Sequence, residues 1–249
     1  MVKIVMTLIP DGKKGVEDPG SPIYLDENII SQPAAALQLV AKEIFRMSDQ
    51  VRDILKKTIE LVKNEEVKSI DGLKENGEQV ERLGKCITEY LAALFSSGSL
   101  TEQQAAQTAS LMCVLSDVER MGTLSVEMAE CMLERSDRKY KYTPEAMDEL
   151  QKSLKVLNKM FCDSLKALQG DDGIEPGKMM KRKDKLLDLD IKMRKAHIER
   201  VNKGKCKASL TAPFTNILHL IDRMGNSCIN LADVAESGTS MKYFMLEEK

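Results

Sequence analysis

Apolar side chains in this chain recur in alternating steps of three and four residues, which is the spacing of one face of an α-helix. The longest run follows Pro33, and its members are Leu37, Val40, Ile44, Met47, Val51, Ile54, Thr58 and Leu61. A seam of this length at heptad spacing is typical of a helix that packs along other helices. The pattern therefore predicts a long first helix that begins near Pro33.

Five further helices are predicted by the same periodicity and by residues that start or stop helices. Thr101 with Gln104, and Thr143 before Pro144, are typical helix-start pairs. Gly170 begins a turn rich in glycine and aspartate. We expect these helices over about 65–97, 101–134, 144–169, 178–203 and from 209 onward.

Three of these helices carry seams as clear as that of the first. The third should bury Leu111, Val114, Val118, Met121, Ser125, Met128 and Met132. The fourth should bury Leu150, Leu154, Leu157, Phe161, Leu165 and Leu168, and the sixth Phe214, Ile217, Ile221, Met224, Cys228, Leu231 and Ala235. Short connections make successive helices antiparallel neighbours. The predicted fold is all-α, with six long helices forming two tandem three-helix bundles of up-down topology.

Proline and glycine mark the boundaries of these units. They are frequent before residue 33, so we predict an irregular leader over 1–32. A charged hinge at 135–142 separates the third helix from the fourth. The first bundle should then occupy 33–140 and the second 141–249.

The two predicted bundles repeat a short sequence in their last helices. Val-Glu-Arg-Met-Gly at 118–122 aligns with Ile-Asp-Arg-Met-Gly at 221–225, and the seams on either side superpose. Such a repeat indicates duplication of one bundle. Glycine inside a helix is unfavourable by about 1 kcal/mol. We therefore expect Gly122 and Gly225 to mark close approaches to a neighbouring backbone.

The charged residues of this repeat allow two interpretations. Glu119 and Asp222 each follow a core position, so they should lie at the edge of the bundle beside Arg120 and Arg223. They could be solvated charges paired with a nearby arginine, which contribute little to stability. Alternatively they belong to a row of carboxylates that binds a hard metal ion.

Composition narrows the functional classes. The net charge of −2 gives no general attraction to nucleic acid. No segment approaches the ~20 apolar residues of a membrane-spanning helix. The cysteines are Cys86, Cys113, Cys131, Cys162, Cys206 and Cys228. They form no Cys-x-x-Cys pair, so we read them as buried free thiols of a protein in a reducing compartment.

A basic segment and two histidines complete the candidate chemistry. The basic segment consists of Lys178, Lys181, Arg182, Lys183 and Lys185. It is either a solvated face or a contact surface for anionic lipid headgroups or an acidic partner. We expect His197 and His219 to be structural. No nucleophile with a nearby base, phosphate-binding glycine loop or paired general acid and base is recognisable, so no catalytic residue and no enzyme is predicted.

The sequence resembles a known family at these motifs. Asp117–Gly122 and its second copy at 221–225 look like the signature of PhoU-type domains, which have two three-helix repeats of spectrin-repeat-like topology. The segments 24–28, 32–37, 42–47 and 194–200 are similar to the cytosolic tail of bacterial sodium/phosphate cotransporters. The similarity extends over about residues 24–249. It implies that residues 1–10 are the end of a membrane segment.

The resemblance also implies a metal site, from which this sequence departs. Free-standing PhoU proteins carry an acidic residue followed four places later by aspartate. Here Thr123 follows Glu119, Asn226 follows Asp222, and Gly77 precedes Glu81. The fifth helix keeps the pair Asp184 and Asp188. We therefore expect no cofactor, with a divalent or iron-type metal on Asp184, Asp188 and Asp222 as the alternative.

The function implied is that of a non-enzymatic regulatory or interaction domain linked to phosphate transport, on the cytoplasmic side of the inner membrane. Its partner would be an upstream transporter domain of the same chain or a phosphate-signalling protein, with a homodimer also possible and nucleic acid excluded. The alternatives are a free-standing metal-binding regulator of phosphate uptake, a metalloenzyme using the carboxylate row, and a helical scaffold unrelated to phosphate.

Overall fold

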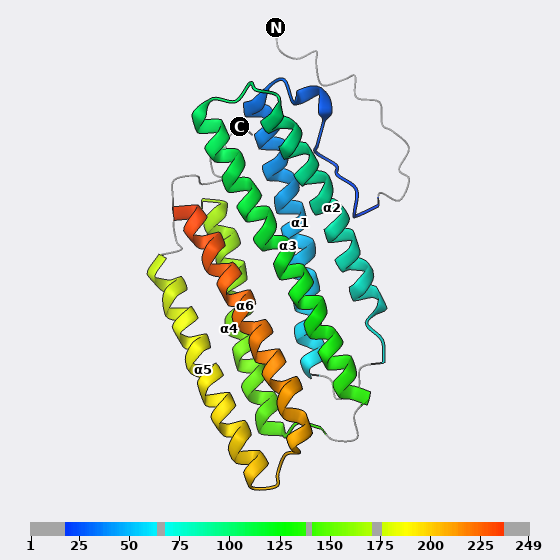
Figure 1. Cartoon of the computed structure of the whole chain (residues 1–249), viewed down its shortest axis with the longest axis vertical. Coiled ribbons are helices and arrows are strands. Elements are labelled where there is room, and N and C mark those ends of the chain that lie inside the picture. Colours follow the sequence, from blue (N-terminus) through cyan, green and yellow to red (C-terminus); the bar gives the residue numbers. More distant parts are fainter. Residues whose placement is uncertain (1–17, 64–67, 138–140, 171–175, 237–249) are drawn as a thin grey trace.

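The computed structural model describes residues 18–63, 68–137, 141–170 and 176–236. These residues form six long helices and contain no strand, which confirms the predicted all-α fold. Two short 3-10 helices precede the first and the last of them, at Glu27–Ile29 and Ala208–Leu210. The long helices are α1 (Pro33–Lys63), α2 (Asp71–Ser96), α3 (Glu102–Asp137), α4 (Pro144–Leu168), α5 (Pro176–Asn202) and α6 (Thr211–Glu236) (Figure 1).

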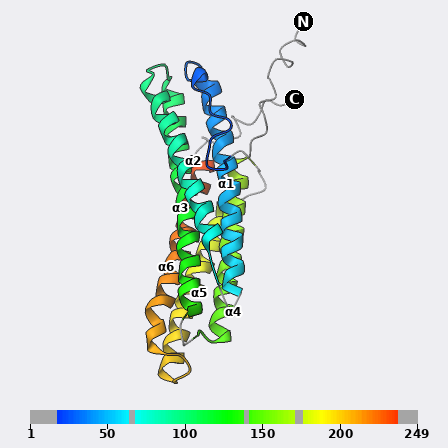
Figure 2. The same ribbon diagram turned by 90° about the vertical axis from the view of Figure 1, so that its right-hand side faces the viewer.

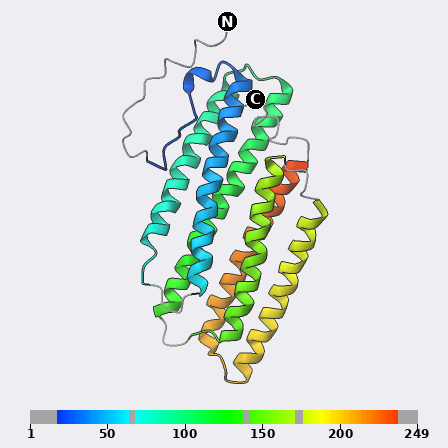
Figure 3. The ribbon, with the colours of Figure 1, turned by 180° about the vertical axis from the view of Figure 1, so that it is seen from behind.

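Four of the helices form the centre of an elongated molecule. Helices α3 and α6 pack side by side, α1 and α4 pack side by side behind them, and α1–α3 and α4–α6 contacts join the two layers (Figures 1 and 3). Helix α2 covers α1 and α3, whereas α5 covers α4 and α6. Figure 2 shows how thin the molecule is across these layers. The two outer helices, α2 and α5, therefore lie at opposite edges.

The predicted seams form the core. Every seam position of the third and fourth predicted helices is buried, including the polar Ser125. In α6 the seam is buried from Phe214 to Leu231, and Ala235 lies partly exposed at its end. A single cluster of buried apolar side chains contains residues of all six helices. The two sets of three helices therefore share one hydrophobic core.

Helix ends follow the capping residues. Thr101 and Gln104 exchange hydrogen bonds between side chains and backbone N–H groups, with N–O distances of 2.9 and 3.3 Å. Thr143 accepts a hydrogen bond from the N–H of Ala146 at 3.3 Å. These starts are as predicted.

Other boundaries differ from the predicted ones. The α2 helix begins at Asp71 rather than near Glu65, and the Ser69 hydroxyl just before it accepts a hydrogen bond from the Asp71 N–H. Residues 64–67 lie outside the described residues, as do residues 138–140 of the predicted hinge and residues 1–17 of the predicted leader.

The described part of the leader is irregular but fastened to the bundle. Glu43 on α1 is fully buried and accepts hydrogen bonds from the N–H groups of Ile23 and Tyr24, at 2.9 and 2.7 Å, and from Arg46 at 2.5 Å. Arg46 in turn donates to two backbone carbonyls of the leader. The Tyr90 hydroxyl of α2 donates to the carbonyl of Asp26. The leader is thus held against both α1 and α2.

Replacing Glu43 with Gln should release the leader. The variant keeps the side-chain volume but loses the charge that strengthens three hydrogen bonds, so the free energy of unfolding should fall by about 1–3 kcal/mol. Amide hydrogen exchange at Ile23 and Tyr24 should accelerate in the same variant. Glu60→Gln, on an exposed position of the same helix, is the control. Unchanged exchange at both amides would contradict the role assigned to Glu43.

Candidate functional site

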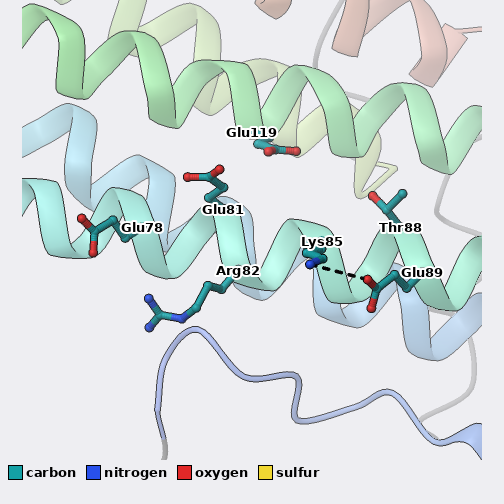
Figure 4. Close-up of a pocket in the computed structure, with 7 residues that line it drawn as sticks. All are labelled: Glu78, Glu81, Arg82, Lys85, Thr88, Glu89 and Glu119. Carbon is teal, nitrogen blue, oxygen red and sulfur yellow. Dashed lines mark ion pairs between the residues drawn. The ribbon is translucent and has the colours of Figure 1, made fainter.

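The repeated signature lies on the two helices that meet at the centre, α3 and α6, where each faces an outer helix. Glu119 on α3 borders a surface groove of about 710 Å³ between α2 and α3. The groove is lined by Glu78, Glu81, Arg82, Lys85, Thr88, Glu89 and Glu119. In Figure 4 the side chains of Glu81 on α2 and Glu119 on α3 lie on facing sides of the groove.

Glu119 lies in the contact between α3 and α2. Its side chain lies over Gly84 of α2, where a Cβ atom would be only 3.1 Å from Oε2. Burial raises the pKa of Glu119, and the negative charge of Glu81 raises it further. Because the helix–helix contact forces the carboxylate partly out of water beside a like charge, ionised Glu119 opposes folding.

Replacing Glu119 with Gln should therefore stabilise the protein at neutral pH. The raised pKa means that the folded state binds the proton more tightly than the unfolded state, so the penalty is present above the folded pKa. It should disappear as the pH falls toward 4.5, the ordinary value for glutamate. Melting temperatures of the variant and the wild type, measured from pH 4 to pH 8, check this difference.

Glu78→Gln, on an exposed position of the same groove, is the matched control and should show no such pH-dependent gain. A Glu119→Gln variant that is less stable than the wild type at pH 7.5 would show that the ionised carboxylate has a favourable partner.

The second copy of the signature has a different environment. Asp222 on α6 forms an ion pair with Lys183 of α5, with an Nζ–Oδ1 distance of 2.5 Å, and Lys183 also donates to the carbonyl of Asp222. Asn226, one turn later, donates to the Asp222 carboxylate at 3.5 Å. Arg223 reaches back to Glu127 of α3 at 3.8 Å. Glu119 in the first half thus lies near a like charge, whereas the corresponding Asp222 in the second half is neutralised by a lysine.

The prediction that Gly122 and Gly225 mark close approaches to a neighbouring backbone is wrong. Both glycines lie against side chains of neighbouring helices. A Cβ atom on Gly122 would lie 3.3 Å from Val51 of α1 and 3.4 Å from Val80 of α2. A Cβ atom on Gly225 would lie 3.1 Å from Leu186 of α5. Each glycine therefore lets the outer helix of its bundle seat an apolar side chain against the inner helix.

Filling the space at Gly122 should destabilise the protein. Gly122→Leu overpacks the contact with Val51 and Val80, and we expect the free energy of unfolding to fall by about 1–3 kcal/mol. Gly72→Leu is the control, because nothing lies within 4 Å of a Cβ atom at Gly72. Denaturant titrations followed by circular dichroism measure both variants. Equal stabilities would show that the space at Gly122 is not filled by its neighbours.

The residues predicted as metal ligands do not come together as a metal site. Asp184 and Asp188 are exposed on α5, and the carboxylate of Asp222 is taken by Lys183. Within the described ranges, no group of three or more histidine, cysteine, aspartate or glutamate side chains is arranged to hold a metal ion. A hard cation needs several anionic oxygens in its first shell. This donor set therefore does not fit a multinuclear metal centre.

The histidines have different environments. His197 is buried, stacks on Phe214 with ring centroids 4.7 Å apart, and lies 3.1 Å from the Thr211 hydroxyl. Burial lowers the pKa of His197, and the nearby Arg200 lowers it further. These contacts give His197 a packing role between α5 and α6. His219 lies on the exposed surface of α6.

The six cysteines are free thiols, as predicted, but their burial varies. Cys206 and Cys228 are buried, whereas Cys113 is exposed and the remaining three are half-buried.

The basic segment at the start of α5 is partly neutralised from within the bundle. Arg182 forms an ion pair with Asp163 of α4, and Lys183 forms the pair with Asp222 described above. Further along the helix, Arg200 pairs with Glu149 of α4 at 3.1 Å. No described helix is both long enough and apolar enough to cross a membrane.

Comparisons with known proteins agree with this architecture. Residues 44–132, within α1–α3, match the PhoU domain. "Phosphate-specific transport system accessory protein PhoU homolog 1" of Thermotoga maritima is 24% identical over 209 residues, which covers 83% of this chain and 88% of that protein. The crystal structure of PhoU from Pseudomonas aeruginosa superposes with a TM-score of 0.72 at 13% identity, covering 79% of this chain and 93% of that one. The likeness to the Pseudomonas structure shows that the two proteins share a fold.

Proposed function

We propose that this chain, which contains a PhoU domain and is homologous to PhoU, is a non-enzymatic regulatory domain of phosphate transport. The observation that carries the proposal is the similarity to a phosphate transport accessory protein along most of both chains. The shared signature residues Arg120 and Arg223 are exposed on α3 and α6. Exposed charges on a rigid helical framework suit a domain that acts by contact with another protein.

The finer form of the proposal is that the chain is the cytosolic tail of a sodium/phosphate cotransporter. Two of the segments that resemble such tails, 24–28 and 42–47, touch each other, because the Tyr24 N–H donates to Glu43 at 2.7 Å. Because the leader is fixed to the bundle, a movement of a preceding membrane domain would be transmitted to the helices. This form places the protein on the cytoplasmic side of the cell membrane.

The alternative is a free-standing regulator of phosphate uptake. It is favoured by the coverage of 88% of the Thermotoga protein, because little of that protein lies outside the similarity. The metal-binding part of this alternative has no support from the donor geometry around Asp222. Elemental analysis of protein purified without chelator tests that part. Stoichiometric iron, manganese or zinc that is lost in an Asp184→Ala, Asp222→Ala double variant would establish a metal-binding regulator.

Phosphate uptake in the native host tests the regulatory role. Deleting the coding region should abolish the adjustment of radiolabelled phosphate uptake to external phosphate, and the wild-type gene should restore it. The Arg120→Ala, Arg223→Ala double variant should restore it poorly while folding normally, because surface charge pairs contribute little to stability. Lys155→Ala, on an exposed position of α4, is the control. Normal adjustment of uptake without the gene would refute the proposal.

The reading frame upstream of residue 1 distinguishes the two forms. Several hydrophobic spans in the native gene would establish the cotransporter tail, and their absence would leave the free-standing regulator.

A further inference from the structure

The outer helix α5 carries a row of apolar side chains that the bundle does not bury. Ten residues of this helix between Met180 and Ile198 are exposed, and four of them are large and apolar. Each of these four side chains is between 53% and 57% exposed. We call them the α5 stripe: Met180, Leu187, Ile191 and Ile198. At 100° per residue they fall within an arc of about 40° and extend for about 27 Å of helix.

The other exposed residues of the same segment are charged, and most of them are basic. They are Lys181, Lys185, Lys192, Lys195, Asp184 and Asp188. The basic side chains of α5 that form ion pairs with described residues are others, namely Arg182, Lys183, Arg194 and Arg200. The four exposed lysines therefore keep their charges in contact with water.

The four lysines lie on the side of the α5 stripe that faces α4. At 100° per residue, they are about 60–140° round the helix from the centre of the stripe. Arg182 and Arg200, which pair with α4, lie further round in the same direction. Lys183, which pairs with α6, lies on the opposite side of the stripe. The exposed edge of α5 is thus apolar toward α6 and basic toward α4.

Helix α4 continues the basic surface. Lys159 and Lys166 are exposed on this helix, four and three residues from Asp163, which pairs with Arg182 of α5. Residues at this spacing share one side of a helix, so both lysines lie beside α5. Residues 141–236 contain 18 basic and 14 acidic residues, whereas the net charge of the whole chain is −2. Positive charge is therefore concentrated in the half of the molecule that contains α5.

The corresponding edge of α2 has neither feature. The buried positions of the two outer helices align with one constant shift, as in the pairs Leu73–Met179 and Val80–Leu186. With this shift, the α2 residues are Lys74, Glu81, Lys85 and Ala92 for the α5 stripe, and Glu75, Gln79, Cys86 and Glu89 for the four lysines. Packing of an outer helix onto the bundle therefore requires neither the apolar nor the basic row.

An apolar row beside a row of lysines on one helix is typical of a surface that binds anionic membranes. The apolar side chains enter the boundary between headgroups and acyl chains, and the long lysine side chains reach the phosphate groups. We propose that α5 docks on an anionic lipid surface, with the α5 stripe inserted at that boundary and the exposed lysines of α5 and α4 bound to headgroup phosphates. This inference does not depend on the proposed function.

The form of this edge favours a lipid surface over a protein partner. Stable protein interfaces extend over about 20–30 residues on each side. The exposed edge of α5 provides ten, on a single helix at the margin of a thin molecule (Figures 1 and 2). A fluid bilayer closes around a projecting helix without a complementary shape, so a few inserted side chains and headgroup contacts are sufficient.

The two aspartates reduce the attraction to anionic headgroups but do not reverse it. Asp184 is three residues from Lys181, and Asp188 is three from Lys185, so each carboxylate is next to a lysine on the helix surface. Four lysines and two aspartates leave this edge positive. Each lysine close to an anionic surface strengthens binding by about fivefold. We therefore expect moderate binding that depends strongly on salt.

Cosedimentation of the full chain with vesicles tests the proposal. The wild type should sediment with vesicles of equimolar phosphatidylglycerol and phosphatidylcholine at low salt, and not with phosphatidylcholine alone. The bound fraction should fall as the salt concentration rises to about 1 M, where the Debye length is about 3 Å. No binding to the anionic vesicles, or equal binding to both kinds, would overturn the proposal.

Replacing lysines of α5 tests the basic row. Binding to the anionic vesicles should weaken by about 100-fold in a triple variant with Lys181→Gln, Lys185→Gln and Lys192→Gln. The matched control removes the same charge from exposed positions of the first half, with Lys57→Gln, Lys63→Gln and Lys68→Gln. The control should bind as the wild type does. Equal binding of the two triple variants would show that only net charge matters and would overturn the assignment to α5.

Replacing the aspartates should have the opposite effect. The Asp184→Asn, Asp188→Asn double variant removes the negative charges from the edge of α5, so it should bind anionic vesicles more tightly than the wild type. Unchanged or weaker binding of this variant would show that this edge does not face the headgroups.

Tryptophan fluorescence tests the insertion of the α5 stripe, because the chain contains no tryptophan of its own. Emission of the Ile191→Trp variant should shift to shorter wavelength on anionic vesicles and be quenched by brominated acyl chains. Phe95→Trp is the matched control, since Phe95 is 56% exposed on α2, and it should show neither change. Vesicle-bound Ile191→Trp protein with unchanged emission would overturn the insertion.

Sedimentation equilibrium distinguishes the alternative of a protein contact. Leu187→Ser removes an exposed apolar side chain, so the variant should fold normally and bind anionic vesicles more weakly than the wild type. Reversible association of the wild type in solution that is lost in Leu187→Ser, without binding to anionic vesicles, would assign the α5 stripe to a protein contact and overturn the proposal.

Discussion

The packing of α1 and α3 against α4 and α6 is the constraint on which the rest of the molecule depends. A single buried cluster contains residues of all six helices, so the two sets of three helices share one continuous apolar interior. The outer helices α2 and α5 are added to this centre, and Gly122 and Gly225 allow their side chains to reach it. The faces that α2 and α5 turn outward are therefore free to diverge, and they have done so.

The divergence is clearest at the carboxylates of the repeated signature. In the first half Glu119 faces Glu81 and keeps a raised pKa, so it holds unfavourable charge at the surface of the groove. In the second half Lys183 satisfies Asp222. Stability alone would favour a neutral side chain at Glu119.

The sequence predicts the core because helical periodicity alone decides which side chains face inward, as in the run from Leu111 to Met132. Contacts between particular side chains of two helices cannot be predicted in this way, because they depend on how each helix is rotated about its axis. The pairing of Lys183 with Asp222 and the side-chain contacts of the glycines could not be derived from spacing. Spacing alone does not predict that Met180, Leu187, Ile191 and Ile198 of α5 are exposed, because Asp184 and Arg194 interrupt their apolar pattern.

The attachment of the leader has a mechanical consequence. Asp18 pairs with Arg82 near the middle of α2, while Glu43 and Arg46 hold the following residues on α1. A load applied to the chain at residue 18 would act across α1 and α2, as a shear, and not along the axis of α1. Several hydrogen bonds would share that load at once. The bundle would then move as one rigid body, and α1 would not unfold from its first turn.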